Sequence, residues 1–282
     1  MIAADFSVEK PARVLCIVAH QDDFEFNAGG TFSRLAELYG DAVRIKVINV
    51  STGASGHHKL DPDETFHRRM QEARASAGMI GASAECLSQL EGTHVAGQVL
   101  VSRNLLGGLW NAIRSFRADF LFCPPVASDP LAGVHIDHEE TARAVRLVAY
   151  QLGVERAYPV VADCAGGCYR SPLIILLDDV YQGNNRWSVA NDISNMFEKK
   201  VRMSACHATQ VFEWLPVHQG RPAPSREEFA TSFRVRHSRI NARYDFDDAS
   251  PREYFQISRW GRGVLPGELE WLFPGALIAN NQ

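Results

Sequence analysis

VLCIVAHQDD, residues 14–23, is an unbroken apolar run that ends on one histidine and two adjacent aspartates. Such a run is typical of a parallel strand that is covered on both faces, because neither side of it meets water. A second polar cluster, HIDH at residues 135–138, follows much later in the chain. One nitrogen and one oxygen from the first cluster and one histidine from the second would leave the fourth position of a zinc ion open to water. The two clusters together therefore predict a catalytic zinc site.

Strand and helix signals alternate along the first two thirds of the chain. Strands are expected at residues 14–19, 43–50, 120–123 and 173–177, and helices at 28–38, 61–80, 107–116 and 138–152. The first helix should follow a turn at Gly29-Gly30, and the second should be capped by Asp61. This order predicts an α/β fold with three layers, a Rossmann-like, mostly parallel sheet flanked by helices. Ligands bind at the carboxyl ends of the strands in such sheets, where both polar clusters are expected.

The chain is expected to form one domain over residues 1–282, since no low-complexity linker separates two halves. Residues 1–178 should supply the core sheet and the metal site. The periodicity weakens after that point, so residues 179–282 should add C-terminal elements that complete the pocket.

Composition indicates an enzyme of the cytoplasm. The 29 Lys and Arg against 33 Asp and Glu give a net charge of −4, which offers no electrostatic attraction to nucleic acid or an acidic membrane surface. The N-terminus lacks a signal-peptide pattern, and no apolar run approaches the roughly 20 residues of a spanning helix. The six cysteines are dispersed and imply no disulfide framework.

The two clusters resemble those of the LmbE-like zinc deacetylases, also called the PIG-L family, in which a strand ends in A-H-P-D-D and an H-x-D-H motif follows. Fainter matches keep the family order: STG at 51–53, Arg69-x-x-Glu72 followed by Gly81, DIS at 192–194, Lys200, His207-x-x-Gln210 and EYF at 253–255. This chain departs from the pattern twice. Gln21 replaces the usual proline and should loosen the turn, and Phe24 stands where a glutamate is common and should make the pocket rim more apolar.

The resemblance implies a zinc ion bound by His20, Asp23 and His138, although another divalent metal could take its place. Successive side chains on an extended segment point apart, so only one of the two adjacent aspartates should be a ligand. Asp22 is then the general base that activates the metal-bound water. His138 lies at an expected helix start, where the positive end of the dipole favours a neutral, ligating imidazole.

The same correspondence gives His135 the role of donating a hydrogen bond to the developing oxyanion or a proton to the leaving amine. Asp137 should hold His135 in orientation. Candidate substrate-binding residues are Arg69, His57, His58 and Phe24. His207 is expected to be a structural hydrogen-bonding residue or part of the pocket wall.

The function these expectations imply is a zinc-dependent hydrolase that removes an N-acetyl group from an N-acetylglucosamine-like amino sugar or its conjugate. Its partner is a small N-acetylated molecule, without nucleic acid or a membrane span, and the sequence permits a homo-oligomer. One alternative is a zinc amidase acting on a thiol conjugate or another non-sugar amide. Another is a non-catalytic α/β protein that binds a metal or a nucleotide, although G-x-G-x-x-G is absent around Gly29-Gly30.

Overall fold

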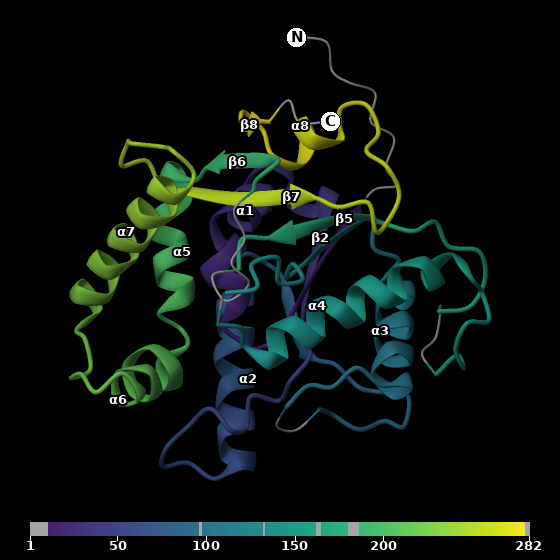
Figure 1. The fold of residues 1–282 in the computed structure, drawn as a ribbon, viewed down its shortest axis with the longest axis horizontal. Helices are drawn as coiled ribbons and strands as arrows, with labels where there is room; N and C mark the ends of the chain where they lie inside the picture. The colour runs from purple at the N-terminus through teal and green to yellow at the C-terminus, as the bar shows by residue number, and fades with distance from the viewer. Residues whose placement is uncertain (1–10, 96–97, 132, 162–164, 180–185, 280–282) are drawn as a thin grey trace.

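A computed structural model describes residues 11–95, 98–131, 133–161, 165–179 and 186–279. At its centre lies one sheet with the strand order β3-β2-β1-β4-β5-β7-β6-β8 (Figure 1). The strands are β1 Ala12–Val18, β2 Val43–Asn49, β3 Ser83–Cys86, β4 Phe120–Cys123, β5 Leu173–Leu177, β6 Val189–Asp192, β7 Arg252–Ile257 and β8 Leu277–Ile278. The first five strands are parallel to one another, and the last three join the sheet in antiparallel pairs.

Helices cover both faces of this sheet, which confirms the predicted three-layer α/β class (Figure 1). The α-helices are α1 Asp23–Tyr39, α2 Pro62–Gly78, α3 Arg103–Phe116, α4 Ile136–Ala149, α5 Phe197–Ser204, α6 Leu215–His218, α7 Arg226–Arg243 and α8 Glu268–Leu272. Shorter helical turns are η1 Gly40–Ala42, η2 Tyr150–Gly153 and η4 Ser194–Met196, and η5 Thr209–Trp214 is a π-helix. None of the helices in the described ranges is both long and apolar enough to span a membrane.

The central strands bury both of their faces, as their continuous apolar sequences predict. Alternate residues of β1 belong to different cores: Val14 packs with Phe32 of α1, and Leu15 packs with Trp110 of α3. Because successive strand side chains point to opposite sides, one short segment holds the two helical layers together. Cys16 is buried as a free thiol, whereas Cys164 lies outside the described residues.

The chain changes direction across the sheet between β1 and β4. From β1 it continues to β2 on one side, and it returns to β4 on the other side of β1. The connections therefore diverge at this switch point and leave a crevice at the carboxyl ends of the two strands. Residues 20–23 follow β1, and the segment that enters α4 follows β4. Both polar clusters thus reach the same edge of the sheet.

Helix α1 begins earlier than the sequence predicts, so Gly29 and Gly30 lie within it and the predicted turn is wrong. A Cβ atom at Gly30 would lie 2.7 Å from Cδ1 of Ile193, which explains the glycine through close packing. The predicted cap of α2 is confirmed, because the Asp61 side chain accepts a hydrogen bond from the Glu64 backbone N–H at 2.9 Å.

The elements after residue 178 extend the sheet and build a second group of helices beside it. Helices α5 and α7 lie side by side (Figure 1) and share an apolar cluster that includes Phe197, Phe229 and Phe233. The π-helix η5 is tied to the first half of the chain, since the Thr209 backbone N–H and hydroxyl both donate to Glu72 of α2. The division of the chain at residue 178 stays a prediction.

Candidate metal centre and active site

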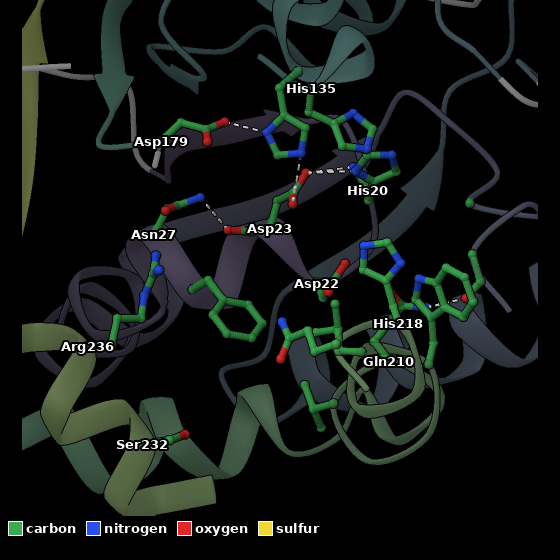
Figure 2. Close-up of a pocket in the computed structure, with 18 of the residues that line it drawn as sticks. His20, Asp22, Asp23, Asn27, His135, Asp179, Gln210, His218, Ser232 and Arg236 are labelled. Atoms are coloured by element: carbon green, nitrogen blue, oxygen red, sulfur yellow. Dashed lines mark hydrogen bonds and ion pairs between the residues drawn. The ribbon is translucent and has the colours of Figure 1, made fainter. Parts of the chain in front are cut away.

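A cavity of about 1470 Å³ opens at the carboxyl ends of β1 and β4. Residues from the two polar clusters line one end of it, and residues of η5, α6 and α7 line the rest. Figure 2 shows this arrangement, with His20, Asp23, His135 and Asp179 gathered on one side and Gln210, His218, Ser232 and Arg236 across from them.

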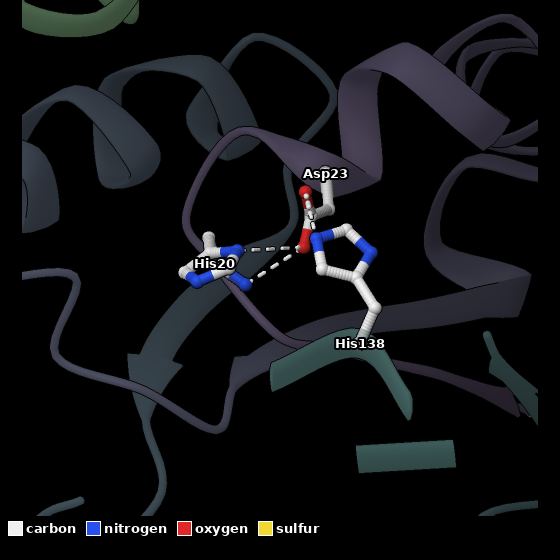
Figure 3. Close-up of side chains that lie close together, drawn as sticks. All are labelled: His20, Asp23 and His138. Carbon is white, nitrogen blue, oxygen red and sulfur yellow. Dashed lines mark hydrogen bonds and ion pairs between the residues drawn. The ribbon is translucent and has the colours of Figure 1, made fainter. Parts of the chain in front are cut away.

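Three side chains converge at the inner end of the cavity. The backbone N–H of His20 donates to the Asp23 carboxylate at 2.7 Å, which closes the turn between β1 and α1. Nδ1 of His20 lies 3.6 Å from Oδ2 of Asp23, and Nε2 of His138 lies 3.5 Å from Oδ1 of the same carboxylate (Figure 3). One potential ligand atom from each residue lies within 4.8 Å of the others. Two nitrogens and one oxygen are a donor set that suits a zinc ion with an open position.

Two further carboxylates hold the imidazoles. Nδ1 of the buried His138 is hydrogen-bonded to Oδ2 of Asp179, which leaves Nε2 directed to the cluster. Asp137 accepts from the Val99 backbone N–H at 2.7 Å and is hydrogen-bonded to Nε2 of His20 at 2.9 Å. Such contacts fix the orientation of ligating imidazoles. The prediction that Asp137 orients His135 is therefore corrected, because its carboxylate is engaged with His20.

Asp179 was absent from the predicted site. A signal for it exists in the sequence, because Asp178 and Asp179 directly follow the buried apolar strand β5, much as the first aspartate pair follows β1 after three further residues. The pattern that singled out residues 14–23 therefore occurs a second time, two strands away in the same sheet.

The electrostatics of the cluster favour added positive charge. Burial disfavours an imidazolium at His20, but hydrogen bonds to Asp137 and Asp23 outweigh it and raise its pKa to about 9. Burial likewise opposes protonation of His138, yet Asp23 and Asp179 raise its pKa. The pKa of Asp23 is lowered despite burial, chiefly by His138 and His20. Protons on the imidazoles balance the carboxylates, and a divalent cation would supply the same charge once those protons leave. The donor set therefore fits a metal ion.

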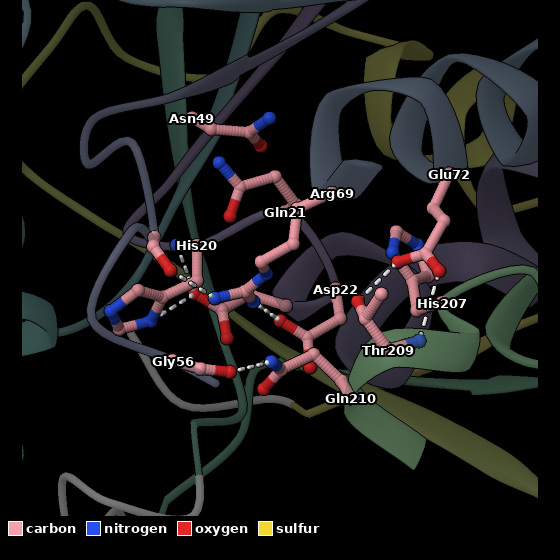
Figure 4. Close-up of polar contacts among 12 residues, drawn as sticks. His20, Gln21, Asp22, Asn49, Gly56, Arg69, Glu72, His207, Thr209 and Gln210 are labelled. Atoms are coloured by element: carbon pink, nitrogen blue, oxygen red, sulfur yellow. Dashed lines mark hydrogen bonds and ion pairs between the residues drawn. The ribbon is translucent and has the colours of Figure 1, made fainter. Parts of the chain in front are cut away.

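Within the described part of the chain, a second group of potential ligands consists of His20, His135 and Asp137. Asp22 belongs to neither group. It occupies the N-cap position of α1, and its Oδ1 accepts a hydrogen bond from Nη2 of Arg69 at 2.8 Å (Figure 4). Arg69 also donates to the carbonyl of Gly53 at 3.2 Å and is only 3 % exposed. Arg69 lines the cavity as expected, but its guanidinium is an internal partner of Asp22.

Gln21 stabilises the turn instead of loosening it. Its Nε2 donates to the carbonyl of Thr52 at 2.8 Å and to that of Ser51 at 3.2 Å, both just beyond the end of β2. The expected effect of replacing the family proline is therefore wrong, because the buried amide joins the turn between β1 and α1 to the segment after β2 by hydrogen bonds.

His135 is the N-cap residue of α4 and is exposed to the cavity. Its Nδ1 accepts a hydrogen bond from the Asp137 backbone N–H at 3.3 Å. Burial and the neighbouring His20 and His138 lower its pKa. A neutral ring with Nδ1 as acceptor carries its proton on Nε2, so His135 has one N–H to donate.

The remaining substrate-binding candidates are not among the described residues that line the cavity. Phe24 is 1 % exposed and stacks edge-on against Phe32 in the core, so its assignment to the pocket rim is corrected. Phe26, two positions later, lines the cavity instead. His57 lies 2.9 Å from the Glu213 carboxylate, and the exposed His58 stacks on Trp214, which is itself a lining residue.

A buried ion pair between His207 and Glu25 lies behind the turn between β1 and α1, and the sequence did not predict it. Nε2 of His207 is 3.0 Å from Oε1 of Glu25, and the same oxygen accepts from the Ser76 hydroxyl. Burial opposes a charge on His207, but Glu25 raises its pKa. The structural role expected for His207 fits this position, since the pair joins α1 to the segment before η5.

Comparison with known protein families gives a match to PIG-L, described as GlcNAc-PI de-N-acetylase, over residues 15–149. We call residues 15–149 the PIG-L segment. The PIG-L segment contains both polar clusters, with His20, Asp23 and His138. A comparison with the sequences of curated proteins gives no match.

The likeness to solved structures extends beyond the PIG-L segment. N,N'-diacetylchitobiose deacetylase from Pyrococcus horikoshii is 20% identical, with 91% of this chain and 88% of that chain covered and a TM-score of 0.67. The 4-carboxy-2-hydroxymuconate hydratase from Pseudomonas putida is 17% identical, covers 90% and 100% respectively, and has a TM-score of 0.59. The zinc-inhibited form of teicoplanin deacetylase is 17% identical, with coverage of 86% and 97% and a TM-score of 0.53. At these identities the likeness establishes a shared fold.

Proposed function

We propose that the protein is a zinc-dependent N-deacetylase that hydrolyses the acetamide of an N-acetylglucosamine-like amino sugar or its conjugate. The observation that carries the proposal is the meeting of His20, Asp23 and His138 at the inner end of a cavity, beside a separate carboxylate, Asp22. The match of residues 15–149 to the PIG-L family and the two deacetylases of similar fold support this chemistry.

His20, Asp23 and His138 would hold the metal. When bound there, zinc supplies Lewis acidity, which lowers the pKa of water and polarises a carbonyl. Asp137 and Asp179 keep the two imidazoles directed inward through their hydrogen bonds. The protein thus contributes a fixed donor set with partners behind each histidine.

Asp22 acts as the general base. It accepts a proton from the attacking water, whose oxygen bonds to the acetamide carbon, and Arg69 keeps the carboxylate in place. The Nε2–H of His135 donates a hydrogen bond to the carbonyl oxygen as negative charge develops there. The carbon–nitrogen bond then breaks, the proton passes to the leaving nitrogen, and acetate and a free amine depart.

The polar lining supports a sugar as the substrate. Asn27, Gln98 and Gln210 present amides to the cavity, and Trp214 offers an aromatic face. Amides bond to hydroxyl groups in both directions, and an aromatic ring packs against the apolar face of a sugar. These contacts would fix the acetamide relative to Asp22.

The test measures acetate release from a panel of N-acetylated amino sugars, amino acids and thiol conjugates, with metal content measured on the same samples. Asp22→Asn should retain the metal and the fold and lose most turnover, because the amide cannot accept a proton. Asp63→Asn, an exposed carboxylate change on α2, is the matched control and should behave as the wild type.

Two outcomes would overturn the proposal in different ways. Zinc-loaded protein that releases no acetate from any amide would favour a metal-binding protein without catalysis. If the protein hydrolysed thiol conjugates or amino-acid amides but no amino sugar, the hydrolase assignment would stand and the amino-sugar substrate would be rejected.

A further inference from the structure

The wall of the cavity opposite the metal centre is one face of helix α7. Phe229, Phe233, Arg236, Ile240 and Arg243 recur at intervals of three or four residues, and all of them line the cavity. That spacing places side chains on one side of a helix. Figure 2 shows two members of this wall, Ser232 and Arg236, on the side away from the histidines.

The face has two chemically different halves. Its N-terminal half is apolar, where Phe233 packs at 5.1 Å from Phe26 and at 5.0 Å from Phe229, measured between ring centroids. Its C-terminal half carries the guanidinium groups of Arg236, Arg239 and Arg243. The cavity therefore offers a cationic wall next to an aromatic one.

Four of the carboxylates that line the cavity are bonded to groups other than Arg239 and Arg221. Asp22 is paired with Arg69, Asp137 with His20 and Asp179 with His138, and Glu228 closes the capping box of α7. Asp23 completes the ligand set.

Among the arginines of the wall, Arg243 is paired with Asp178. Arg239 and Arg221, which also line the cavity, form no ion pair with any residue in the described ranges. Positive charge is therefore in excess here, although the whole chain carries a net charge of −4.

The size of the cavity leaves room for more than a monosaccharide. Its volume of about 1470 Å³ exceeds the roughly 300–1,000 Å³ of an ordinary small-molecule site. With the acetamide at the metal centre, the remainder of the substrate would extend along α7. Guanidinium groups recognise carboxylates and phosphates through paired, charge-assisted hydrogen bonds.

We propose that the α7 wall binds an anionic group, a carboxylate or a phosphate, carried by the substrate on the part remote from its acetamide. This inference rests on the proposed deacetylase function and narrows its substrate class. Arg239 and Arg221 would contact the anion, and Arg236 would add to the positive potential. Arg239 and Arg221 are both exposed, so an anion that enters the cavity can reach them.

The first test compares kcat/KM for acetate release by the zinc-loaded protein from three probes. They are N-acetylglucosamine, N-acetylglucosamine 6-phosphate and N-acetylglucosaminuronic acid, which are respectively neutral, phosphorylated at C6 and carboxylated at C6. At least one anionic probe should exceed the neutral sugar by about tenfold, the usual size of one charge-assisted contact. The better anionic probe then distinguishes phosphate from carboxylate.

Substitutions at Arg239 test whether this residue causes the preference for the anionic probes. Arg239→Gln should lower the ratio of anionic to neutral kcat/KM severalfold, Arg239→Glu should lower it further, and Arg239→Lys should restore part of it. Arg234→Gln is the matched control, because Arg234 lies on the same helix but does not line the cavity and is paired with Glu198. The control should leave the ratio unchanged. Equal kcat/KM for all probes, or an equal fall of the ratio in the control, would overturn the inference.

A binding measurement tests the anion site independently of the proposed deacetylation reaction. Calorimetric titration of the zinc-loaded protein with glucosamine 6-phosphate and with glucosamine needs no turnover. Tighter binding of the phosphate, weakened by Arg239→Gln, would support the anion site even if no acetate were released. If acetate were released but glucosamine 6-phosphate and glucosamine bound with equal affinity, the deacetylase proposal would stand and the anion site would be rejected.

Discussion

The contact between Asp22 and Arg69 fixes the orientation of the carboxylate that we propose as the general base. Asp22 follows a strand end and precedes α1, so its backbone is fixed by the turn while its side chain depends on the guanidinium at 2.8 Å. Arg69 is itself buried and bonded to the Gly53 carbonyl. It acts through Asp22, as a positioning residue.

Arg69→Gln should therefore retain the metal and lower kcat by about tenfold to a hundredfold, since a misplaced base loses much of its contribution. Steady-state kinetics and metal analysis on the same sample check this. Arg68→Gln is the control, because Arg68 is exposed, adjacent on α2 and paired only with Glu64. A normal kcat in Arg69→Gln would remove Arg69 from the mechanism. A fall in metal content would instead indicate that it supports the ligand turn.

The raised pKa of His20 makes metal affinity depend on pH. The protonated form is favoured below about pH 9, and the ring must lose that proton before it can bind a metal ion. Apparent zinc affinity should therefore rise by about tenfold or more per pH unit between pH 6.5 and 8.5.

Competition with a chromophoric chelator at several pH values measures this dependence. Asp137→Asn weakens the contact that raises the pKa, so the dependence should level off at a lower pH in that variant. A flat affinity in the wild type would contradict the charged state assigned to His20.

At the scale of elements, a buried ion pair joins α1 to the C-terminal half of the chain. Glu253 of β7 accepts hydrogen bonds from the backbone N–H groups of Gly30 and Thr31 at 2.8 and 2.7 Å. Lys200 of α5 donates to Glu253 at 2.7 Å and to the carbonyl of Phe26 at 3.0 Å. Both charged groups thus bond to the backbone of α1, the helix that begins at the proposed metal ligand Asp23. Burial lowers the pKa of Lys200, and Glu253 opposes that shift.

Replacing one member of this pair should destabilise the protein strongly. Lys200→Met leaves the Glu253 carboxylate buried without its cation, which typically costs about 3–5 kcal/mol. The double variant Lys200→Met, Glu253→Leu should lose less than either single variant, because no uncompensated charge remains. Urea unfolding of the four proteins gives the coupling energy. Additive losses would mean that the two residues stabilise α1 independently.

For the whole molecule, the sequence predicted the strands of the sheet more accurately than it predicted which polar groups bond to each other. The bounds of β4 and β5 agree with their apolar runs, because full burial on both faces is visible in the sequence itself. The Gly29-Gly30 turn was wrong because the reason for Gly30 is Ile193, a contact made only in the folded chain.

At the site, too, features set by neighbouring residues in the sequence were predicted correctly, and features set by distant residues were not. The strand-end position placed Asp22 and Asp23 correctly at the crevice, since all parallel strands end at one edge. The partner of Asp137 is His20, 117 positions away, and spacing along the chain favoured the nearby His135. Phe24 was misplaced because the direction of each α1 side chain depends on the start of that helix. The hydrogen-bond partner of each polar side chain therefore depends on tertiary contacts, which spacing along the chain does not reveal.

The metal site links segments that are distant in the sequence, so metal should stabilise the whole fold. His20 and Asp23 follow β1, whereas His138 lies in α4, and the unfolded chain does not hold these three groups together. A ligand that binds only the folded state at a hundred times its Kd stabilises it by about 2.7 kcal/mol. For a chain of this size, such a gain should raise the Tm by about 5 °C or more.

Calorimetry on chelator-treated protein, before and after zinc is restored, measures the shift. Asp23→Asn removes the carboxylate that faces both histidines, so its Tm should be nearly independent of zinc. Asp41→Asn, in the η1 turn far from the ligands in sequence, is the matched control and should keep the full shift. If Asp23→Asn gained as much as the wild type, zinc would be stabilising the fold at another site, because a ligand can shift unfolding only through groups that bind it in the folded state.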